Sequence, residues 1–199
     1  MPQLRNILVA FVALALSACG VNTIPTAEEN AKARWADVEA AFQERANLVP
    51  NLAAVAKGAA EQEKAILTGV VEARAKATSI QLSADDLTDP AKMAQFSAAQ
   101  EQLSQSLAGF GRLLANFERY PELKSIANYQ MLQSQLEGQE NRIRITIRDY
   151  NQAVQQYNTT IRTFPNIIGA KLIYGAKPMA TYKAATPGAD VAPSLEGKI

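Results

Sequence analysis

Two carboxylates one helical turn apart, Glu137 and Glu140, are candidates for acid–base chemistry in this chain. Their spacing of three places both on one face of a helix, where one could donate a proton and the other accept one. Such a pair works only in a cleft that holds the substrate, and the sequence shows no pocket around it. We therefore favour a non-enzymatic protein and keep a hydrolase that uses Glu137 and Glu140 as the alternative.

The composition excludes most other chemistry. The chain has no histidine, the usual general base and metal ligand, and it has a single cysteine, Cys19. Zinc sites built from Cys and His, and di-iron sites built on Glu-x-x-His, are therefore excluded, and we expect neither a metal nor another cofactor. Twenty basic residues against 19 acidic ones leave the net charge near zero, which argues against a nucleic-acid partner.

A row of arginine and amide side chains recurs at steps of three and four in the last long helical stretch. Arginine and amide groups suit carboxylates, phosphates and sugars, so the row is a candidate polar groove for an anionic partner. The alternative is a solvated flank that pairs with acids of a neighbouring helix, such as Glu61, Glu63 or Glu72. The candidate groove comprises Asn141, Arg144, Arg148, Asn151, Asn158 and Arg162.

The apolar seam of the same stretch contains one polar misfit. Counting back by three from Ile143 reaches Glu140, which places this carboxylate on the core side of the helix. A buried carboxylate needs a cation or several donors, and Arg45 is a candidate partner if the helices align. A solvated position at the end of the bundle, or a ligand or ion site, are the alternatives.

Helical periodicity accounts for nearly all of residues 28–165, and no strand pattern competes with it. Pro50 predicts a kink or a break in the first stretch, because proline removes a backbone donor. Asp89 and Pro90 predict the start of a second helix, and Pro165 ends the last one. Short connections between long helices predict an all-α, up-and-down antiparallel bundle of three to four long helices.

The first 18 residues have the layout of a secretory signal peptide, with Arg5, an apolar run and small residues before Cys19. The apolar run, residues 7–16, is shorter than the roughly 20 residues that span a bilayer. An uncleaved membrane anchor and a buried N-terminal helix are the alternatives. The sequence Leu-Ser-Ala-Cys-Gly at residues 16–20 resembles the lipobox of bacterial lipoproteins, which implies acyl chains on Cys19.

The chain divides into five predicted segments. Gly20 stands where, by resemblance to enterobacterial lipoproteins, an aspartate would retain the protein at the inner membrane. We therefore favour the outer membrane, with the chain facing the periplasm. The segments are a signal peptide at 1–18, a lipidated tether at 19–27, the helical bundle at 28–165, an amphipathic segment at 166–182 that docks on the bundle or on a membrane, and a disordered tail at 183–199.

Four stretches resemble the signatures of the LemA family, in the family's order. They are residues 45–52 (RANLVPNL), 120–124 (YPELK), 132–143 (LQSQLEGQENRI) and the tyrosine- and asparagine-containing run at 149–165. The resemblance covers residues 35–182 and implies an all-α bundle anchored at its N-terminus in a bacterial envelope. Many members look as though they keep an uncleaved N-terminal membrane helix, whereas this chain carries a lipobox.

The family pattern also places polar residues both at the Pro50 kink and along the seam of the last helix. The resemblance implies that these residues meet in space, where they could fix the register of the helices or form a binding spot. With Arg45 as the partner of Glu140, the candidate buried polar cluster comprises Arg45, Asn47, Asn51, Glu137, Glu140 and Arg142.

The sequence thus predicts a non-enzymatic helical lipoprotein of a bacterial envelope, held to a membrane by acyl chains on Cys19. Its expected partner is a protein or a cell-wall polymer, contacted through the candidate polar groove. Besides the hydrolase, an accessory role in envelope signalling or transport, with motion at the Pro50 kink, is a further alternative.

Overall fold

The computed structural model describes residues 3, 22–55, 61–115 and 127–184, and this part of the chain is helical without any strand. The predicted all-α class is confirmed. The predicted signal peptide apart from residue 3, Cys19, residues 120–124 and residues 185–199 of the predicted tail lie outside the described residues, whereas residues 183–184 of that tail are described. The four long helices are α2 (Thr23–Val55), α3 (Glu61–Ser79), α4 (Pro90–Ala115) and α5 (Ala127–Thr160).

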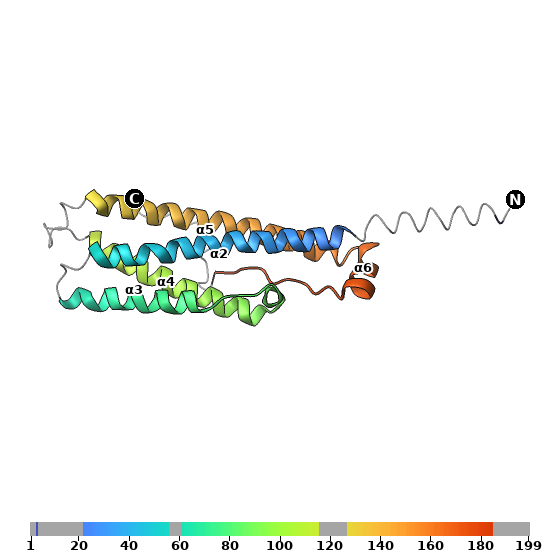
Figure 1. Ribbon diagram of the computed structural model, residues 1–199, viewed down its shortest axis with the longest axis horizontal. Helices are drawn as coiled ribbons and strands as arrows, with labels where there is room; N and C mark the ends of the chain where they lie inside the picture. Colours follow the sequence, from blue (N-terminus) through green and yellow to red (C-terminus); the bar gives the residue numbers. More distant parts are fainter. Residues whose placement is uncertain (1–2, 4–21, 56–60, 116–126, 185–199) are drawn as a thin grey trace, which may run out of the picture.

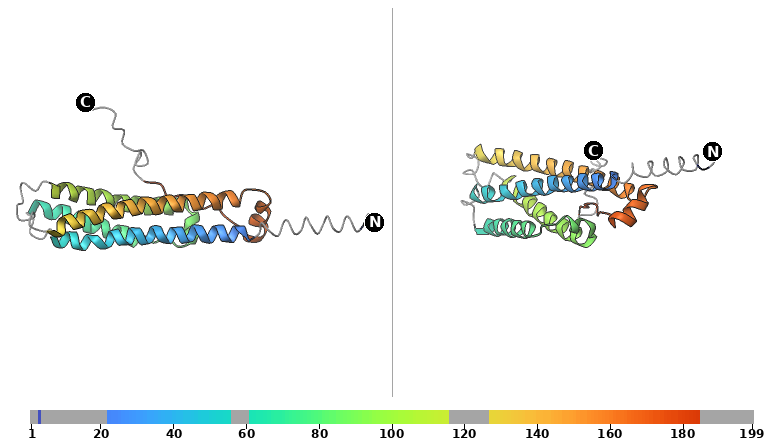
Figure 2. Two further views of the ribbon diagram at one scale, coloured as in Figure 1. Left: turned by 90° about the horizontal axis from the view of Figure 1, so that it is seen from above. Right: turned by 45° about the vertical axis from the view of Figure 1, so that its right-hand side comes forward.

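The long helices form an up-and-down bundle in which successive helices run in opposite directions (Figure 1). Helix α2 packs mainly against α5, and α3 packs mainly against α4. Two contacts show the antiparallel register of α2 and α5, because Trp35 meets Tyr150 while Arg45 meets Glu140. The views in Figure 2 show the same elongated arrangement from two other directions.

Helix α2 departs from the sequence prediction at both ends. It begins at Thr23, so residues 23–27 are helical rather than part of a tether, because Ile24 and Ala27 are buried in the core. It also continues through Pro50 to Val55 and is not broken there. Proline leaves the carbonyl of Ala46 without its helical donor, and Arg74 of α3 supplies one, with 2.8 Å between Arg74 Nε and the Ala46 oxygen.

The helix start predicted at Asp89 and Pro90 is confirmed after the connection between α3 and α4. A 3₁₀ turn, η2 (Asp85–Thr88), lies in this loop and buries Leu87. The Asp89 carboxylate then caps α4, because its Oδ1 accepts hydrogen bonds from the backbone N–H groups of Ala91 and Lys92 at 2.8 and 3.3 Å.

Two hydrophobic cores follow one another along the bundle. The proximal core surrounds the start of α2 and the end of α5, and its aromatic side chains pack edge to face; the ring centroids of Trp35 lie 5.3 Å from Phe96 and 5.0 Å from Tyr150. The distal core lies toward the other end and is mainly aliphatic. Its buried members are Val49, Val70, Ala73, Ala77, Leu103, Leu107 and Phe110.

After α5 the chain makes a compact turn and then runs back along the bundle. The turn consists of α6 (Asn166–Gly169) and a single π-helical turn, η5 (Ala170–Tyr174). Gly175 ends it at φ +55°, a backbone conformation that side chains rarely adopt. Residues 176–184 are extended and place Met179 and Tyr182 in the proximal core. We call residues 176–184 the strap.

Candidate functional site

A layer of polar side chains crosses the bundle between the two cores, centred on Arg45 of α2. Nη1 of Arg45 donates to Glu140 Oε1 of α5 at 2.8 Å and to Ser104 Oγ of α4 at 2.6 Å. Nη2 donates to the backbone oxygen and to Oε1 of Gln100 at 3.2 and 3.0 Å. Gln100 Nε2 donates to the Ala77 carbonyl of α3 at 3.2 Å, so all four long helices meet here. Arg45, Gln100, Ser104 and Glu140 are called the polar layer.

The ion pair in the polar layer is buried on one side only. The Arg45 side chain is 1% exposed and its guanidinium lies 5.1 Å from the centre of the Phe42 ring, whereas the Glu140 side chain is 47% exposed. The predicted pairing of Arg45 with Glu140 is therefore confirmed, with the carboxylate at the edge of the bundle. Because Glu140 Oε1 is engaged by the guanidinium, this carboxylate is oriented toward a structural partner.

The other members of the candidate buried polar cluster do not join the layer. Asn47 and Asn51 are exposed, because they lie two and six positions beyond Arg45, which turns them about 160° and about 120° away from its side of the helix. Glu137 is also exposed. Arg142 pairs at the surface with Glu44, at 2.8 Å between Nη1 and Oε2. The prediction of one buried cluster of six residues is wrong.

Two Tyr-Asn pairs of α5 hold the strap against the bundle. The Asn158 amide exchanges two hydrogen bonds with the backbone of Met179, both 2.9 Å, and the Asn151 amide does the same with Tyr182, at 3.0 and 2.8 Å. The preceding tyrosines add a bond each. Tyr157 Oη donates to the Lys177 carbonyl at 3.1 Å, and Tyr150 Oη donates to the Ala180 carbonyl at 2.8 Å.

The spacing of these pairs explains why the strap fits. Asn151 and Asn158 are seven residues apart, which is roughly 10.5 Å along a helix. Met179 and Tyr182 are three residues apart, which is about 10 Å along an extended chain. The two amides therefore act as substitutes for a neighbouring strand, and the strap runs antiparallel to α5. Further hydrogen bonds join the strap to the other side, from Ala180 N to the Leu87 carbonyl at 2.8 Å and from Ser97 Oγ to the Lys183 carbonyl.

This arrangement divides the candidate polar groove. Asn151 and Asn158 bind the protein's own strap. The remaining residues are Asn141, Arg144, Arg148 and Arg162, and all four are exposed. Arg144 donates to Asn141 Oδ1 at 3.3 Å and Arg148 pairs with the adjacent Asp149 at 3.4 Å, both within α5. We call Arg144, Arg148 and Arg162 the arginine row.

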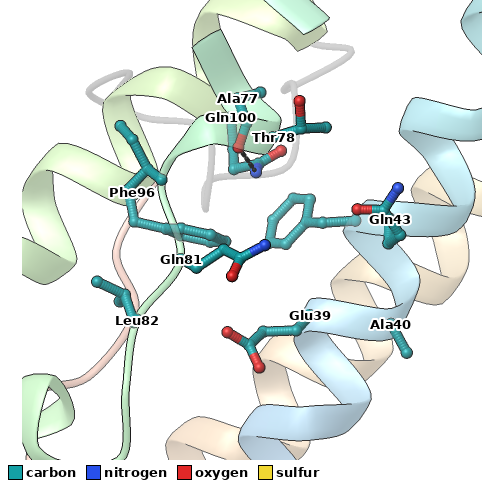
Figure 3. A pocket seen from close by; sticks show the side chains of 11 residues that line it. Glu39, Ala40, Gln43, Ala77, Thr78, Gln81, Leu82, Phe96 and Gln100 are labelled. Atoms are coloured by element: carbon teal, nitrogen blue, oxygen red, sulfur yellow. Dashed lines mark hydrogen bonds between the residues drawn. The ribbon is translucent and has the colours of Figure 1, made fainter. Parts of the chain in front are cut away.

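A cavity of about 430 Å³ opens beside the proximal core, between α2, the end of α3 and α4 (Figure 3). The Glu39 carboxylate from α2 and the Gln81 amide from the segment after α3 extend toward the same space from opposite sides. Its walls combine aromatic, aliphatic and amide side chains, with Glu39 as the charged member of the described lining. The lining residues are Glu39, Ala40, Phe42, Gln43, Ala77, Thr78, Ile80, Gln81, Leu82, Phe96 and Gln100.

The electrostatics of this cavity suit a ligand that donates hydrogen bonds. Burial raises the pKa of the Glu39 carboxyl above its ordinary value, while the Trp35 indole and the Leu82 backbone N–H act in the opposite direction. A carboxylate beside an apolar wall and amide groups attracts an amine or a hydroxyl and repels an anion. Neither Glu137 nor Glu140 lines the cavity.

No pattern in the sequence indicates this cavity. Glu39 and Gln43 occupy ordinary flanking positions of a helix, and Gln81 lies in a connection without periodicity. Gln100 carried the clearest available signal, because it falls on the buried side of α4 between Phe96 and Leu103. A polar residue at such a position needs partners, and here it bridges the polar layer and the cavity.

The family model of the LemA family matches residues 34–196, which include the polar layer, the arginine row and the strap. The chain belongs to the LemA family. Among its relatives are the magnetosome proteins MamQ 1 and MamQ 2 of Paramagnetospirillum magneticum, each 29% identical over 180 residues, 79% of this chain. This LemA-family chain spans 62% of the length of either MamQ protein. Protein LemA of Metamycoplasma hominis is 38% identical over 63 residues, 31% of this chain and 29% of that protein.

Two further properties concern membrane-spanning helices and metal ligands among the described residues. Every helix among them falls short of the combined length and apolarity that crossing a bilayer requires. The same residues bring together no group of three or more acidic or cysteine side chains that could hold a metal ion.

Proposed function

We propose that this LemA-family chain is a membrane-anchored protein of a bacterial envelope whose helical bundle binds an anionic partner without catalysing a reaction. The observation that carries the proposal is the arginine row on α5. Arg144 and Arg148 lie one turn apart and are exposed, and Arg162 follows just beyond the helix. Exposed guanidinium groups at this spacing suit carboxylates or phosphates of an acidic protein surface or a cell-wall polymer.

The polar layer supports a binding role over hydrolysis. Glu140, one half of the candidate catalytic pair, accepts a hydrogen bond from a buried arginine at 2.8 Å. Glu137 lies exposed on the same helix and outside the lining of the cavity. A general acid and base must reach one bound substrate, and these two carboxylates serve different surroundings.

The proposed anchor is a pair of features at the N-terminus. The signal-peptide layout of residues 1–18 and the lipobox-like sequence that ends in Cys19 and Gly20 support lipid attachment at Cys19. Acyl chains there would hold the bundle at a membrane surface, and we propose the periplasmic face of the outer membrane.

The arginine row is tested by replacing Arg144, Arg148 and Arg162 with alanine. The variant should lose salt-sensitive binding to purified cell-wall polymer, or salt-sensitive crosslinking to an envelope protein, with little change in helicity or Tm. The matched control replaces Arg34, Lys76 and Arg112, exposed basic residues of α2, α3 and α4, and changes the net charge equally. Binding that survives the first variant, or fails equally in both, refutes the arginine row as the contact.

The anchor is tested with Cys19→Ser. Metabolic labelling with palmitate should mark the parent chain and leave the variant unlabelled, with the precursor uncleaved. Labelling of the variant would show that the acyl chains are attached elsewhere or that the proposed anchor is wrong.

A further inference from the structure

Large apolar side chains gather on the outside of the turn that follows α5. Five of them are between 40% and 81% exposed. Ala170 of this turn and Ile161, shortly before it, are buried against the bundle, so the segment is packed on its inner side and apolar on its outer side as well. A soluble surface rarely presents so many large apolar groups within a dozen residues. We call this set the apolar cap: Phe164, Ile168, Leu172, Ile173 and Tyr174.

The apolar cap lies at the end of the bundle where α2 begins. Figures 1 and 2 show α6 beside the start of α2 in every view, and Ile24 shares the proximal core with Ile161 and Ala170. Cys19 is four residues before Thr23, so it lies within about 14 Å of the start of α2 however the intervening chain runs. A lipid attached at Cys19 therefore brings the apolar cap to the surface of the same bilayer.

The charge around the cap favours an anionic surface. From residue 150 to residue 189 the sequence has four basic residues, Arg162, Lys171, Lys177 and Lys183, and no acidic one. The acidic residues at this end of α2, Glu28 and Glu29, share Lys32 at 2.8 and 2.9 Å, so one net negative charge stands there against the four basic residues. Basic side chains beside exposed apolar ones are the pattern of segments that lie in the headgroup region of a membrane.

We propose that the apolar cap inserts into the boundary between headgroups and acyl chains of the bilayer that holds the Cys19 lipid, with Lys171 and Lys177 at anionic headgroups. This proposal rests on the proposed function for the anchor at Cys19. The cap is then a second membrane contact, and it fixes how the bundle stands. Helix α2, with 33 residues, then extends its far end roughly 50 Å from its start near the membrane surface.

The test places tryptophan at two ends of the full-length chain, purified in its lipidated form and reconstituted in vesicles of phosphatidylethanolamine and phosphatidylglycerol. Leu172→Trp lies in the cap, and Met131→Trp lies near the start of α5 at the distal end. Both positions are exposed, so the fold should tolerate both changes. Trp35 stays as a constant background, because it is buried in the proximal core. Emission is recorded with and without lipids brominated in their acyl chains.

The cap proposal predicts that Leu172→Trp is blue-shifted by the vesicles and loses most of its added emission to brominated lipid, whereas Met131→Trp changes in neither respect. If the two variants behave alike while the protein floats with the vesicles, insertion of the cap is refuted, and lipid attachment at Cys19 is still supported. If the chain purified from its envelope carries no lipid on Cys19 and Leu172→Trp is still quenched, the cap is supported and the anchor is wrong. A chain that does not float with vesicles at all overturns both.

A second variant separates insertion from a change in folding. Phe164→Ser, Leu172→Ser and Ile173→Ser together remove the most exposed apolar groups and should leave Tm within about 2 °C, because these side chains contact little of the bundle. The lipidated triple variant should exchange between vesicles at least tenfold faster than the parent. An unchanged exchange rate would contradict insertion of the cap.

Discussion

The two halves of the bundle are stabilised by different kinds of side-chain packing. The proximal core is aromatic, and it includes a fifth, extended element, the strap, whose Met179 and Tyr182 are buried beside Trp35 and Phe96. The distal core is smaller, mainly aliphatic and made by long helices alone. The difference shows that the half next to the proposed anchor is the one to which the C-terminal strap adds buried side chains.

The polar layer lies at the boundary between these halves. Arg45 stands between Phe42 of the proximal core and Val49 of the distal core, and Gln100 stands between Phe96 and Leu103 in the same way. A buried guanidinium that links α2 to both α4 and α5 allows few alternative registers, because a slip removes the partners of its donors. The layer therefore keeps the two cores aligned.

The largest expected effects come from removing one large side chain from each core. Trp35→Ala should destabilise the protein by about 3–5 kcal/mol and Leu103→Ala by about 2–5 kcal/mol in urea unfolding. The two should differ in the strap. Trp35 supports Tyr150, whose hydroxyl binds the Ala180 carbonyl, so only Trp35→Ala should speed amide exchange of residues 176–184 under native conditions. Equal acceleration by both variants would show that the halves unfold as one unit.

The next largest effect is expected in the polar layer between the two cores. Arg45→Met should cost about 3 kcal/mol, because it leaves the buried oxygens of Gln100 without their donor. Glu140→Gln keeps an oxygen for Arg45 at a half-exposed position and should cost about 1 kcal/mol or less. Urea unfolding of both variants measures the asymmetry. Similar losses would mean that the carboxylate is as important to the layer as the arginine.

A smaller effect belongs to the strap. Asn158→Ala and Asn151→Ala each remove two hydrogen bonds to the backbone and should cost about 1–2 kcal/mol. Amide exchange should rise most at Met179 in the first variant and at Tyr182 in the second. Asn141→Ala, at an exposed position of the same helix, is the matched control. Uniform exchange across residues 176–184 in either variant would indicate that the strap detaches as a whole.

Sequence periodicity predicted the parts of this molecule that depend on local repetition. The helical stretches follow from spacing along single helices, and the Asp89 cap follows from the Asp-Pro pair at the helix start. Spacing also placed Glu140 on the core side of α5, whereas its pairing with Arg45 depends on how α2 and α5 align. Pro50 was the exception, because its effect depends on whether another helix can satisfy the Ala46 carbonyl. Arg74 does so from α3, and nothing local to α2 signals that contact.

The candidate groove shows where periodicity stops being informative. The pattern correctly placed Asn151 and Asn158 on one face of a helix, but the same pattern fits solvent, a partner or the protein's own chain. The strap has no periodic signal, because its two buried side chains, Met179 and Tyr182, are only three residues apart in an extended segment. The cavity likewise forms between α2 and a loop that are neighbours only in three dimensions.

The smallest expected effect is a pH-dependent change in stability at Glu39, which lines the cavity at the edge of the proximal core. Burial raises the pKa of this carboxyl in the folded protein above the ordinary value of 4.5, so the neutral form favours folding. The contribution of the neutral Glu39 carboxyl to the free energy of unfolding is present below pH 4.5 and is lost as the pH rises through the folded-state pKa. Glu39→Gln, which stays neutral, should therefore match the parent near pH 4 and be more stable at pH 7.

The difference at pH 7 should be a few tenths of a kcal/mol, about 1 °C in Tm, because solvent still screens this half-exposed group. Thermal unfolding across pH 4–7 measures it, and Glu72→Gln at an exposed position of α3 controls for the loss of one negative charge. A stabilised variant would mean that the Glu39 carboxylate lowers the stability of the proximal half. Residues of binding sites often have such a cost. A destabilised variant would mean that Glu39 helps to hold α2 against the loop through the Leu82 amide, and that the cavity is a gap in packing.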